Sequence, residues 1–256
     1  MGLAVFTASL ACVPSAAAAP ELDAVVEEVF LGEVVFAQGR LELQITNAVS
    51  YLRAGDDDLL GDAVQVELGI TEDLQIEASA TGQSRRSPEG SAAGLGNSEV
   101  GLLYGLVSDP ATGFALSAGL SVGFPEVTSG VGEDAYSLEP VVILYKVLGP
   151  LHTNLSVAPE VVLEDDEAGT TVGGSAALSL FSRLGRFVPV LEVGGERDDE
   201  GVTVALAGGL LWHPHDEVEV GVGVVVGLTA ASPDAGGFLH LAWEIELDDD
   251  HEEVPQ

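Results

Sequence analysis

Residues 61–81 (GDAVQVELGITEDLQIEASAT) alternate strictly between apolar and polar or small side chains on both sides of a short polar turn. Four aliphatic side chains, from Val64 to Ile70, occupy every second position before the turn at 71–73, and the same period resumes after it. This pattern predicts a β-hairpin with one apolar and one polar face. Each arm has about ten residues, the length that a tilted strand needs to cross the hydrocarbon core of a bilayer.

The rest of the chain repeats this hairpin, and the alternation predicts twelve strands. They span 40–52, 61–70, 74–84, 97–107, 113–124, 135–147, 151–163, 170–182, 186–196, 201–212, 217–229 and 236–247. Short polar turns alternate along the chain with connections that are mostly longer, more acidic or richer in Gly, Ser and Pro. The sequence therefore predicts an all-β fold: a transmembrane up-and-down antiparallel β-barrel of about 12 strands, with short periplasmic turns, longer external loops and both termini periplasmic. The alternative is a periplasmic β-sandwich or a soluble lipocalin-like barrel.

Composition favours the membrane barrel over the soluble one. Hydrophobic residues make up 46% of the chain and the mean hydropathy is +0.33, yet beyond the N-terminus no apolar run is long enough for a membrane helix. In the strand at 217–229, Val and Leu occupy one face while the other face is mostly Gly. A soluble barrel buries its large apolar side chains inside, so this arrangement requires lipid outside.

The chain ends differ from the barrel in composition. Residues 1–19 resemble a secretory signal peptide, 20–39 form a short acidic segment expected in the periplasm, 40–247 form the barrel, and 248–256 form an acidic tail. The sole cysteine, Cys12, excludes an internal disulfide and falls within the signal segment. Ser9-Leu10-Ala11-Cys12 also loosely resembles a lipoprotein cleavage box, which leaves lipidation of Cys12 as an alternative.

Acidic residues dominate the charge, with 42 Asp and Glu against 8 Lys and Arg and a formal net charge of −34. This balance argues against nucleic acid as a partner. Inward positions of the predicted barrel carry the residues expected to line a substrate path: Glu67, Glu77, Glu99, Glu160, Glu192, Glu219, His240 and Glu244. Because few bases can pair with them, the lumen is expected to hold water, cations or protonated acids. The alternative is that these carboxylates only solvate the mouths of the barrel.

No motif for catalysis or for a cofactor emerges. His213-Pro214-His215-Asp216 suggests a metal site but also a turn, and the turn is favoured by its position between two strands. A twelve-stranded outer-membrane phospholipase needs a Ser–His pair, and neither His152 nor His240 has a suitably placed serine. We therefore expect no enzyme, no metal and no cofactor.

Three segments resemble the outer-membrane β-barrel transporter family named after MetA of the phenol meta-cleavage pathway. Residues 69–76 (GITEDLQI) resemble its G-L-T-D-R-L-E-L hairpin. Residues 94–101 (GLGNSEVG) are similar to its G-x-G-D-x-x-x-G motif, with Asn97 in place of Asp. Residues 116–125 resemble its G-x-x-x-P-T-G strand end, with Glu126-Val127 in place of Thr-Gly. The resemblance implies a barrel that passes small aromatic or hydrophobic compounds across the outer membrane.

Together these patterns predict a bacterial outer-membrane channel or transporter for small neutral or cationic molecules, with an acidic lumen lined by small residues. The alternative is a non-conducting scaffold or surface barrel with a closed lumen. Expected partners are outer-membrane lipid and lipopolysaccharide, the barrel-insertion machinery that reads the last strand, and a small-molecule substrate that the sequence does not identify.

Overall fold

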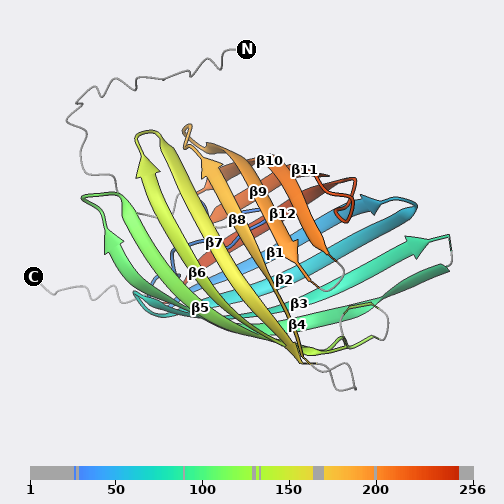
Figure 1. Ribbon diagram of the computed structural model, residues 1–256. Helices are drawn as coiled ribbons and strands as arrows, with labels where there is room; N and C mark the ends of the chain where they lie inside the picture. Colours follow the sequence, from blue (N-terminus) through green and yellow to red (C-terminus); the bar gives the residue numbers. More distant parts are fainter. Residues whose placement is uncertain are drawn as a thin grey trace, which may run out of the picture.

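The chain folds into a closed barrel of twelve antiparallel strands (Figure 1). This computed structural model describes residues 26, 29–88, 90–128, 131–132, 134–163, 170–198 and 201–247. The strands are β1 (Glu42–Ala54), β2 (Asp57–Thr71), β3 (Leu74–Ser87), β4 (Gly90–Asp109), β5 (Phe114–Phe124), β6 (Tyr136–Leu148), β7 (Leu151–Leu163), β8 (Thr170–Phe181), β9 (Phe187–Arg197), β10 (Val202–His215), β11 (Val218–Gly227) and β12 (Ala235–Glu246). Each strand pairs with its neighbours in sequence, and β1 pairs with β12 to close the barrel. The predicted fold class is confirmed.

The two ends of the barrel differ in their connections. The connections β2–β3, β4–β5, β6–β7, β8–β9 and β10–β11 are short and lie where β1 begins and β12 ends; we call this the turn end. The opposite end, the loop end, carries the longer β5–β6 and β11–β12 connections. The turn predicted at 213–216 is shorter and lies further along the chain: β10 extends to His215, and the turn consists of Asp216 and Glu217.

Two predicted loops are wrong. Residues 53–60 and 85–96 were expected to be external loops, but most of them belong to strands, and β1 and β2 are paired as far as Ala54 and Asp57. Their polar side chains interrupt the apolar pattern, which is why they read as loops. A strand that extends beyond the hydrocarbon layer no longer needs an apolar outer face, so polar composition does not end it.

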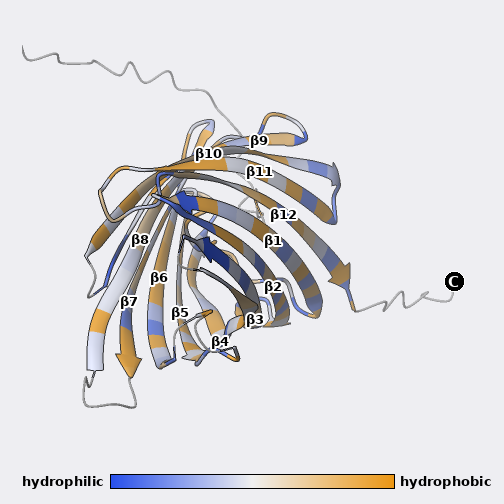
Figure 2. Cartoon of the chain, turned by 90° about the vertical axis from the view of Figure 1, so that its right-hand side faces the viewer, coloured by the Kyte–Doolittle hydropathy of each residue, from blue (hydrophilic) through white to orange (hydrophobic). Residues whose placement is uncertain are grey.

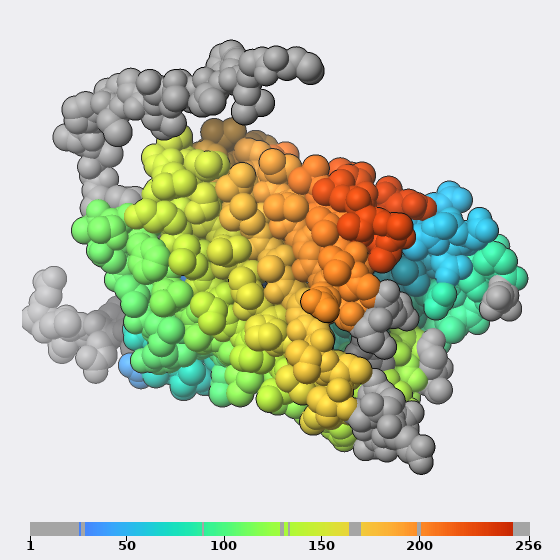
Figure 3. All heavy atoms as spheres, in the orientation of Figure 1, coloured from blue at the N-terminus to red at the C-terminus, as the bar shows by residue number. Residues whose placement is uncertain are grey.

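Apolar and polar residues alternate along the strands of the wall (Figure 2), and many large aliphatic side chains are exposed on its outer face. On β11, Val222, Val224 and Val226 are 57%, 65% and 43% exposed, whereas the inward Val225 is 5% exposed. Space-filling atoms form a continuous wall over the strands on the side seen in Figure 3. Such a band of exposed aliphatic side chains suits contact with lipid. Among the described residues no helix is both long and apolar enough to span a bilayer.

Aromatic side chains do not all lie on the outer face. Trp212 and Trp243 are exposed near the turn end, as interfacial residues of membrane barrels commonly are. Phe238 also falls near a strand end in the sequence, but its ring stacks inside the barrel on Phe30. Its neighbours across the sheet, Ser50 and Gly223, leave room for an inward ring.

Residues 29–39 lie inside the barrel. The sequence places residues 20–39 before the barrel as a periplasmic segment, and the described part of that range instead crosses the lumen. Its apolar side chains Val29 and Val35 join a core with large inward side chains of the wall, including Leu103, Ile143, Tyr145, Phe181, Val188, Val190 and Leu211. Burial of this apolar surface stabilises the segment inside the barrel. The predicted signal peptide and acidic tail lie outside the described residues.

Candidate functional site

We call residues 29–39 the plug, because they run across the lumen without forming a strand. Five buried side chains of the wall bind the plug or position the side chains that do, one each from β1, β3, β5, β7 and β9: Gln44, Gln75, Ser117, Asn154 and Glu192. Each is no more than 2% exposed. Buried backbone N–H and C=O groups outside a sheet need such partners.

Glu192 binds the first turn of the plug. Its carboxylate accepts hydrogen bonds from the backbone N–H of Phe30 at 2.6 Å and of Leu31 at 3.4 Å. The hydroxyl of Ser179 donates to the same carboxylate at 2.7 Å. Three donors point at the Glu192 oxygens, the arrangement that suits an ionised carboxylate, and hydrogen bonds to charged acceptors are the stronger kind.

The other contacts follow the plug around the wall toward β1. Asn154 donates to the backbone carbonyl of Glu33, and Ser117 donates to that of Val35. Gln75 accepts from the backbone N–H of Gln38 at 2.8 Å. The Gln38 side chain in turn donates to Gln44 at 2.7 Å. The plug is therefore hydrogen-bonded to the wall along most of its length.

The ring of Phe30 occupies a recess that we call the Phe30 seat, formed by Gly209, Gly223, Phe238 and His240. The Phe30 and Phe238 rings stack with centroids 6.0 Å apart and planes at 16°, and His240 lies 5.9 Å from Phe30. A Cβ at Gly209 would lie 2.4 Å from the Phe30 ring, and one at Gly223 would lie 3.1 Å from it. Only glycine at these positions lets the ring approach the wall so closely.

A buried carboxylate, Glu219, lies behind the seat. Two histidine nitrogens flank it, with His240 Nε2 3.0 Å from one oxygen and His213 Nε2 3.2 Å from the other. Because a carboxylate only accepts, His240 is the donor in its hydrogen bond with Glu219. This interaction fixes the ring plane of His240 against Phe30.

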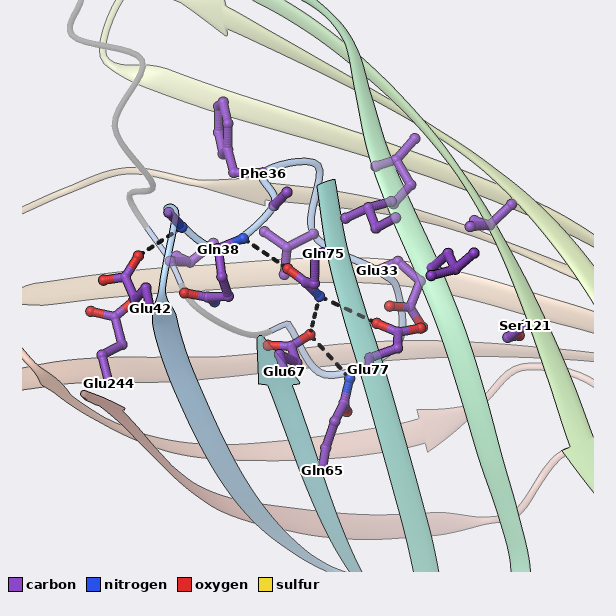
Figure 4. A pocket seen from close by; sticks show the side chains of 18 of the residues that line it. Glu33, Phe36, Gln38, Glu42, Gln65, Glu67, Gln75, Glu77, Ser121 and Glu244 are labelled. Atoms are coloured by element: carbon purple, nitrogen blue, oxygen red, sulfur yellow. Dashed lines mark hydrogen bonds between the residues drawn. The ribbon is translucent and has the colours of Figure 1, made fainter. Parts of the chain in front are cut away.

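Between the plug and the turn end lies an acidic cavity of about 540 Å³, the inner cavity (Figure 4). Its carboxylates come from the plug, from several strands and from two turns: Glu33, Glu42, Glu67, Glu72, Glu77, Glu99, Glu139, Asp216 and Glu244. Gln75 Nε2 donates to Glu67 at 2.8 Å and lies 3.3 Å from Glu77. Since the other end of the same amide holds the plug, Gln75 links the plug to the acidic cavity.

Glu33 brings a carboxylate of the plug into this group. Its side chain is exposed to the open space of the inner cavity, inside the barrel. Enclosure by the protein, and then the negative charges of Glu77, Glu67, Glu99 and Glu139, raise the pKa of Glu33 to about 8. The plug therefore carries a carboxyl group that binds a proton more readily than a free one.

On the loop-end side of the plug lies a second space of about 760 Å³, the outer cavity. Phe30 and Phe238 belong to its lining, and its walls carry mainly small or apolar side chains such as Ala48, Leu52 and Ala63. Residues 33–34 and 36–39 line the inner cavity while Phe30 lines the outer one. The plug thus lies between the two cavities.

Seven of the eight predicted path residues fall into two groups. Glu67, Glu77, Glu99 and Glu244 line the inner cavity. Glu192, Glu219 and His240 instead bind the plug or support the Phe30 seat. Glu160 lies on β7 opposite Gly173, close enough to Glu139 and Glu196 for electrostatic repulsion. Inward orientation is common to both groups, but their surroundings differ.

Sequence reasoning missed the plug and the side chains that hold it. A signal was present, because strict alternation fails in 141–145 (VVILY), 187–191 (FVPVL) and 210–212 (LLW), where both faces are apolar. A wall with large apolar side chains on both faces needs something to pack against inside. The only described segment outside the strands with matching apolar residues is the plug.

Comparison with solved structures finds outer-membrane barrels. The COG4313 outer membrane channel from Pseudomonas putida F1 superposes with a TM-score of 0.66 at 12% identity, covering 85% of this chain and 100% of that one. The KdgM porin gives 0.57 at 10% identity, with 78% and 98% coverage, and the NanC porin gives 0.55 at 10%, with 77% and 97%. The fold is therefore that of porin-like outer-membrane barrels.

No family model matches the sequence, and no curated protein matches it either. The resemblance to the family named after MetA thus stays a prediction from its three motifs. No group of three or more His, Cys, Asp or Glu side chains is placed to hold a metal ion in the part of the chain described above.

Proposed function

We propose that this protein is an outer-membrane channel for small neutral or cationic molecules, and that the plug closes its lumen at rest. One observation carries the proposal: two cavities of about 540 and 760 Å³ lie within one barrel, and a segment that is not part of the wall lies between them. A lumen filled by strand side chains would not leave such spaces. Displacing the plug joins the cavities without breaking any strand pairing.

The acidic lining supports neutral or cationic passengers. Six strand carboxylates, the turn residues Glu72 and Asp216, and Glu33 of the plug line the inner cavity, and among the described residues of that lining the only Arg or Lys is Arg183. Rings of carboxylates favour cations and exclude anions in pores. Small aromatic or hydrophobic passengers, as the MetA-family resemblance implies, fit the outer cavity, whose wall is largely apolar.

We further infer that the turn end faces the periplasm and that the outer leaflet, with its lipopolysaccharide, contacts the loop-end half of the wall. Short turns at the periplasmic end are the rule in outer-membrane barrels. The β12 strand, with Leu239, Leu241 and Trp243 facing outward, suits recognition by the barrel-insertion machinery.

Planar-bilayer recording of refolded full-length protein tests the channel. We expect wild type to remain mostly closed and a variant lacking residues 29–38 to give discrete, cation-selective steps in a KCl gradient. Heat-modifiable migration on gels checks that the deletion variant still forms a barrel.

A barrel that inserts but never conducts, even without residues 29–38, would refute the channel and favour the alternative of a non-conducting scaffold. The extensive bonding of the plug to the wall is the observation that favours this alternative. The deletion distinguishes the two functions because a channel should conduct once the plug is removed, whereas a closed scaffold should not.

A further inference from the structure

The Phe30 seat resembles a ligand site occupied by the protein itself. The backbone nitrogen, Cα, Cβ and ring of Phe30 have the connectivity of 2-phenylethylamine. Its nitrogen lies 2.6 Å from the Glu192 carboxylate, and its ring stacks on Phe238 and packs over the paired Gly209 and Gly223. We propose that the Phe30 seat is a binding site for arylalkylammonium ions, which Phe30 occupies until such a ligand displaces it. This proposal rests on the channel function proposed above and names its substrate class.

The chemistry of the seat matches an ammonium better than the amide it now holds. Glu192 is 1% exposed and accepts from Phe30, Leu31 and Ser179. An ammonium would replace two neutral backbone donors with one charged donor of three N–H bonds. Hydrogen bonds between two ionised groups are stronger than those with one, so the charged ligand has an advantage that Phe30 lacks.

The ring half of the seat is equally defined. Gly209 and Gly223 remove the side chains that would fill the recess, and Phe238 and His240 offer aromatic faces. Offset or stacked rings at centroid distances of 4.5–7 Å attract beyond simple burial. A planar ring two carbons from the charge therefore fits, whereas a simple alkylammonium leaves the recess empty.

Charge excludes other aromatic molecules. Glu219 lies behind the seat and Glu192 beside it, and both are about 1% exposed. A carboxylate-bearing ring would meet two buried anions, which is costly without counter-charges. The neutral alcohol of the same shape keeps the ring contacts and one hydrogen bond to Glu192, but it lacks the positive charge and two of the three donors of the ammonium.

Access runs through the outer cavity. Phe30 and Phe238 are both part of its lining, so a ligand in that cavity touches the edge of the seat before entering it. Beyond the plug, the carboxylates of the inner cavity attract the same positive charge. Displacing Phe30 also removes the first bonds that hold the plug, which couples binding to opening.

Occupation by Phe30 lowers the apparent affinity of the ligand. When only a fraction of molecules have an empty seat, the apparent dissociation constant rises by the inverse of that fraction. Removing the Phe30 ring should therefore tighten binding, while removing the charge of Glu192 should weaken it. These opposite signs distinguish a ligand site from a merely structural contact.

Calorimetric titration of full-length refolded protein in micelles with 2-phenylethylammonium chloride tests the proposal. We expect Phe30→Ala to bind at least about tenfold more tightly than wild type. Adding Glu192→Gln to Phe30→Ala should weaken binding at least about tenfold, whereas adding Glu99→Gln, the matched control in the inner cavity, should change it less than about threefold. The alcohol 2-phenylethanol, 3-phenylpropionate and propylammonium should each bind at least about tenfold more weakly.

Equal affinity of wild type and Phe30→Ala, an unchanged affinity with Glu192→Gln, or equal binding of the alcohol would each overturn the proposal. If Phe30→Ala does not fold, wild type alone decides it: saturating ligand must accelerate hydrogen exchange at the amides of Phe30 and Leu31, and unchanged exchange overturns it. These readouts do not depend on conductance. A protein that conducts but does not bind the ligand would refute only this proposal, and a protein that binds the ligand but does not conduct would refute only the proposed function.

Discussion

The lumen has two unlike sides, although both carry inward glutamates. On the seat side, formed by β9–β12, Glu192 and Glu219 are buried and bonded to the plug or to histidine. On the acidic side, formed by β2–β6, Glu77, Glu99 and Glu139 surround an open cavity. An inward carboxylate therefore has no fixed role in a barrel. The plug donates backbone N–H groups to Glu192 on the seat side, whereas its backbone N–H groups elsewhere bond Gln75 and Glu42. Glu77, Glu99 and Glu139 therefore line the cavity instead of holding the plug.

Glu192→Ala should have the largest effect on the plug. The substitution leaves two buried N–H groups without an acceptor, which costs about 1–3 kcal/mol. We expect the open fraction in single-channel records to rise roughly 5- to 150-fold. Glu99→Ala on the acidic side serves as the control, since Glu99 makes no hydrogen bond that holds the plug. An equal rise in open fraction in both variants would show that the glutamates on the two sides do not differ in how they hold the plug.

A matched pair of glycines, one on each side of the lumen, provides a second test of the difference between the two sides. A Cβ at Gly223 would crowd the Phe30 ring, with three ring carbons at 3.1–3.2 Å, whereas one at Gly101 would meet the flexible end of Glu77. We expect Gly223→Ala to raise the open fraction roughly tenfold, the effect of about 1.4 kcal/mol of overpacking. Gly101→Ala should leave it within about twofold, because a carboxylate can turn aside. Single-channel recording of the two variants at one voltage measures their open fractions.

Charge on the acidic side should govern selectivity without governing closure. In the deletion variant lacking residues 29–38, we expect Glu67→Gln, Glu77→Gln and Glu99→Gln together to lower the cation-to-anion permeability ratio roughly two- to threefold. The measurement is the reversal potential in a KCl gradient. Glu219→Gln on the seat side is the comparison, and a larger change there would mean that the permeating ion passes the seat instead.

A further expected effect is a pH dependence of closure through Glu33. Its pKa of about 8 in the seated plug exceeds its ordinary value of 4.5. The seated state therefore binds the extra proton, so seating is favoured at low pH and weakens as pH rises from 4.5 through 8. We expect the open fraction of wild type to increase between pH 5 and pH 8.5, and Glu33→Gln to flatten that increase. If the open fraction of wild type instead falls as the pH rises, the pH dependence has the opposite sign and Glu33 is excluded as its source.

Sequence alone determined the wall of this protein. A side-chain period of two is a local property of an extended chain, so alternation at positions such as 64–70 fixes strand, face and approximate length without knowledge of partners. The same reasoning predicted the number of strands. It also predicted that the first strand begins and the last strand ends at the end of the barrel that carries the short turns. The prediction of a loop at 85–96 was wrong because polar residues continue a strand there beyond the apolar band. In that region, polar composition does not indicate whether the backbone is paired.

The arrangement inside the lumen depends on contacts between residues far apart in the sequence. The contacts of Glu192 with Phe30 join residues 162 positions apart, and no local pattern encodes them. Whether an inward glutamate binds the plug or lines a cavity depends on the path of a segment that has no periodicity of its own. Burial and hydrogen bonding between distant residues set that path, so the sequence predicted a barrel with an acidic interior and the fold divided that interior in two.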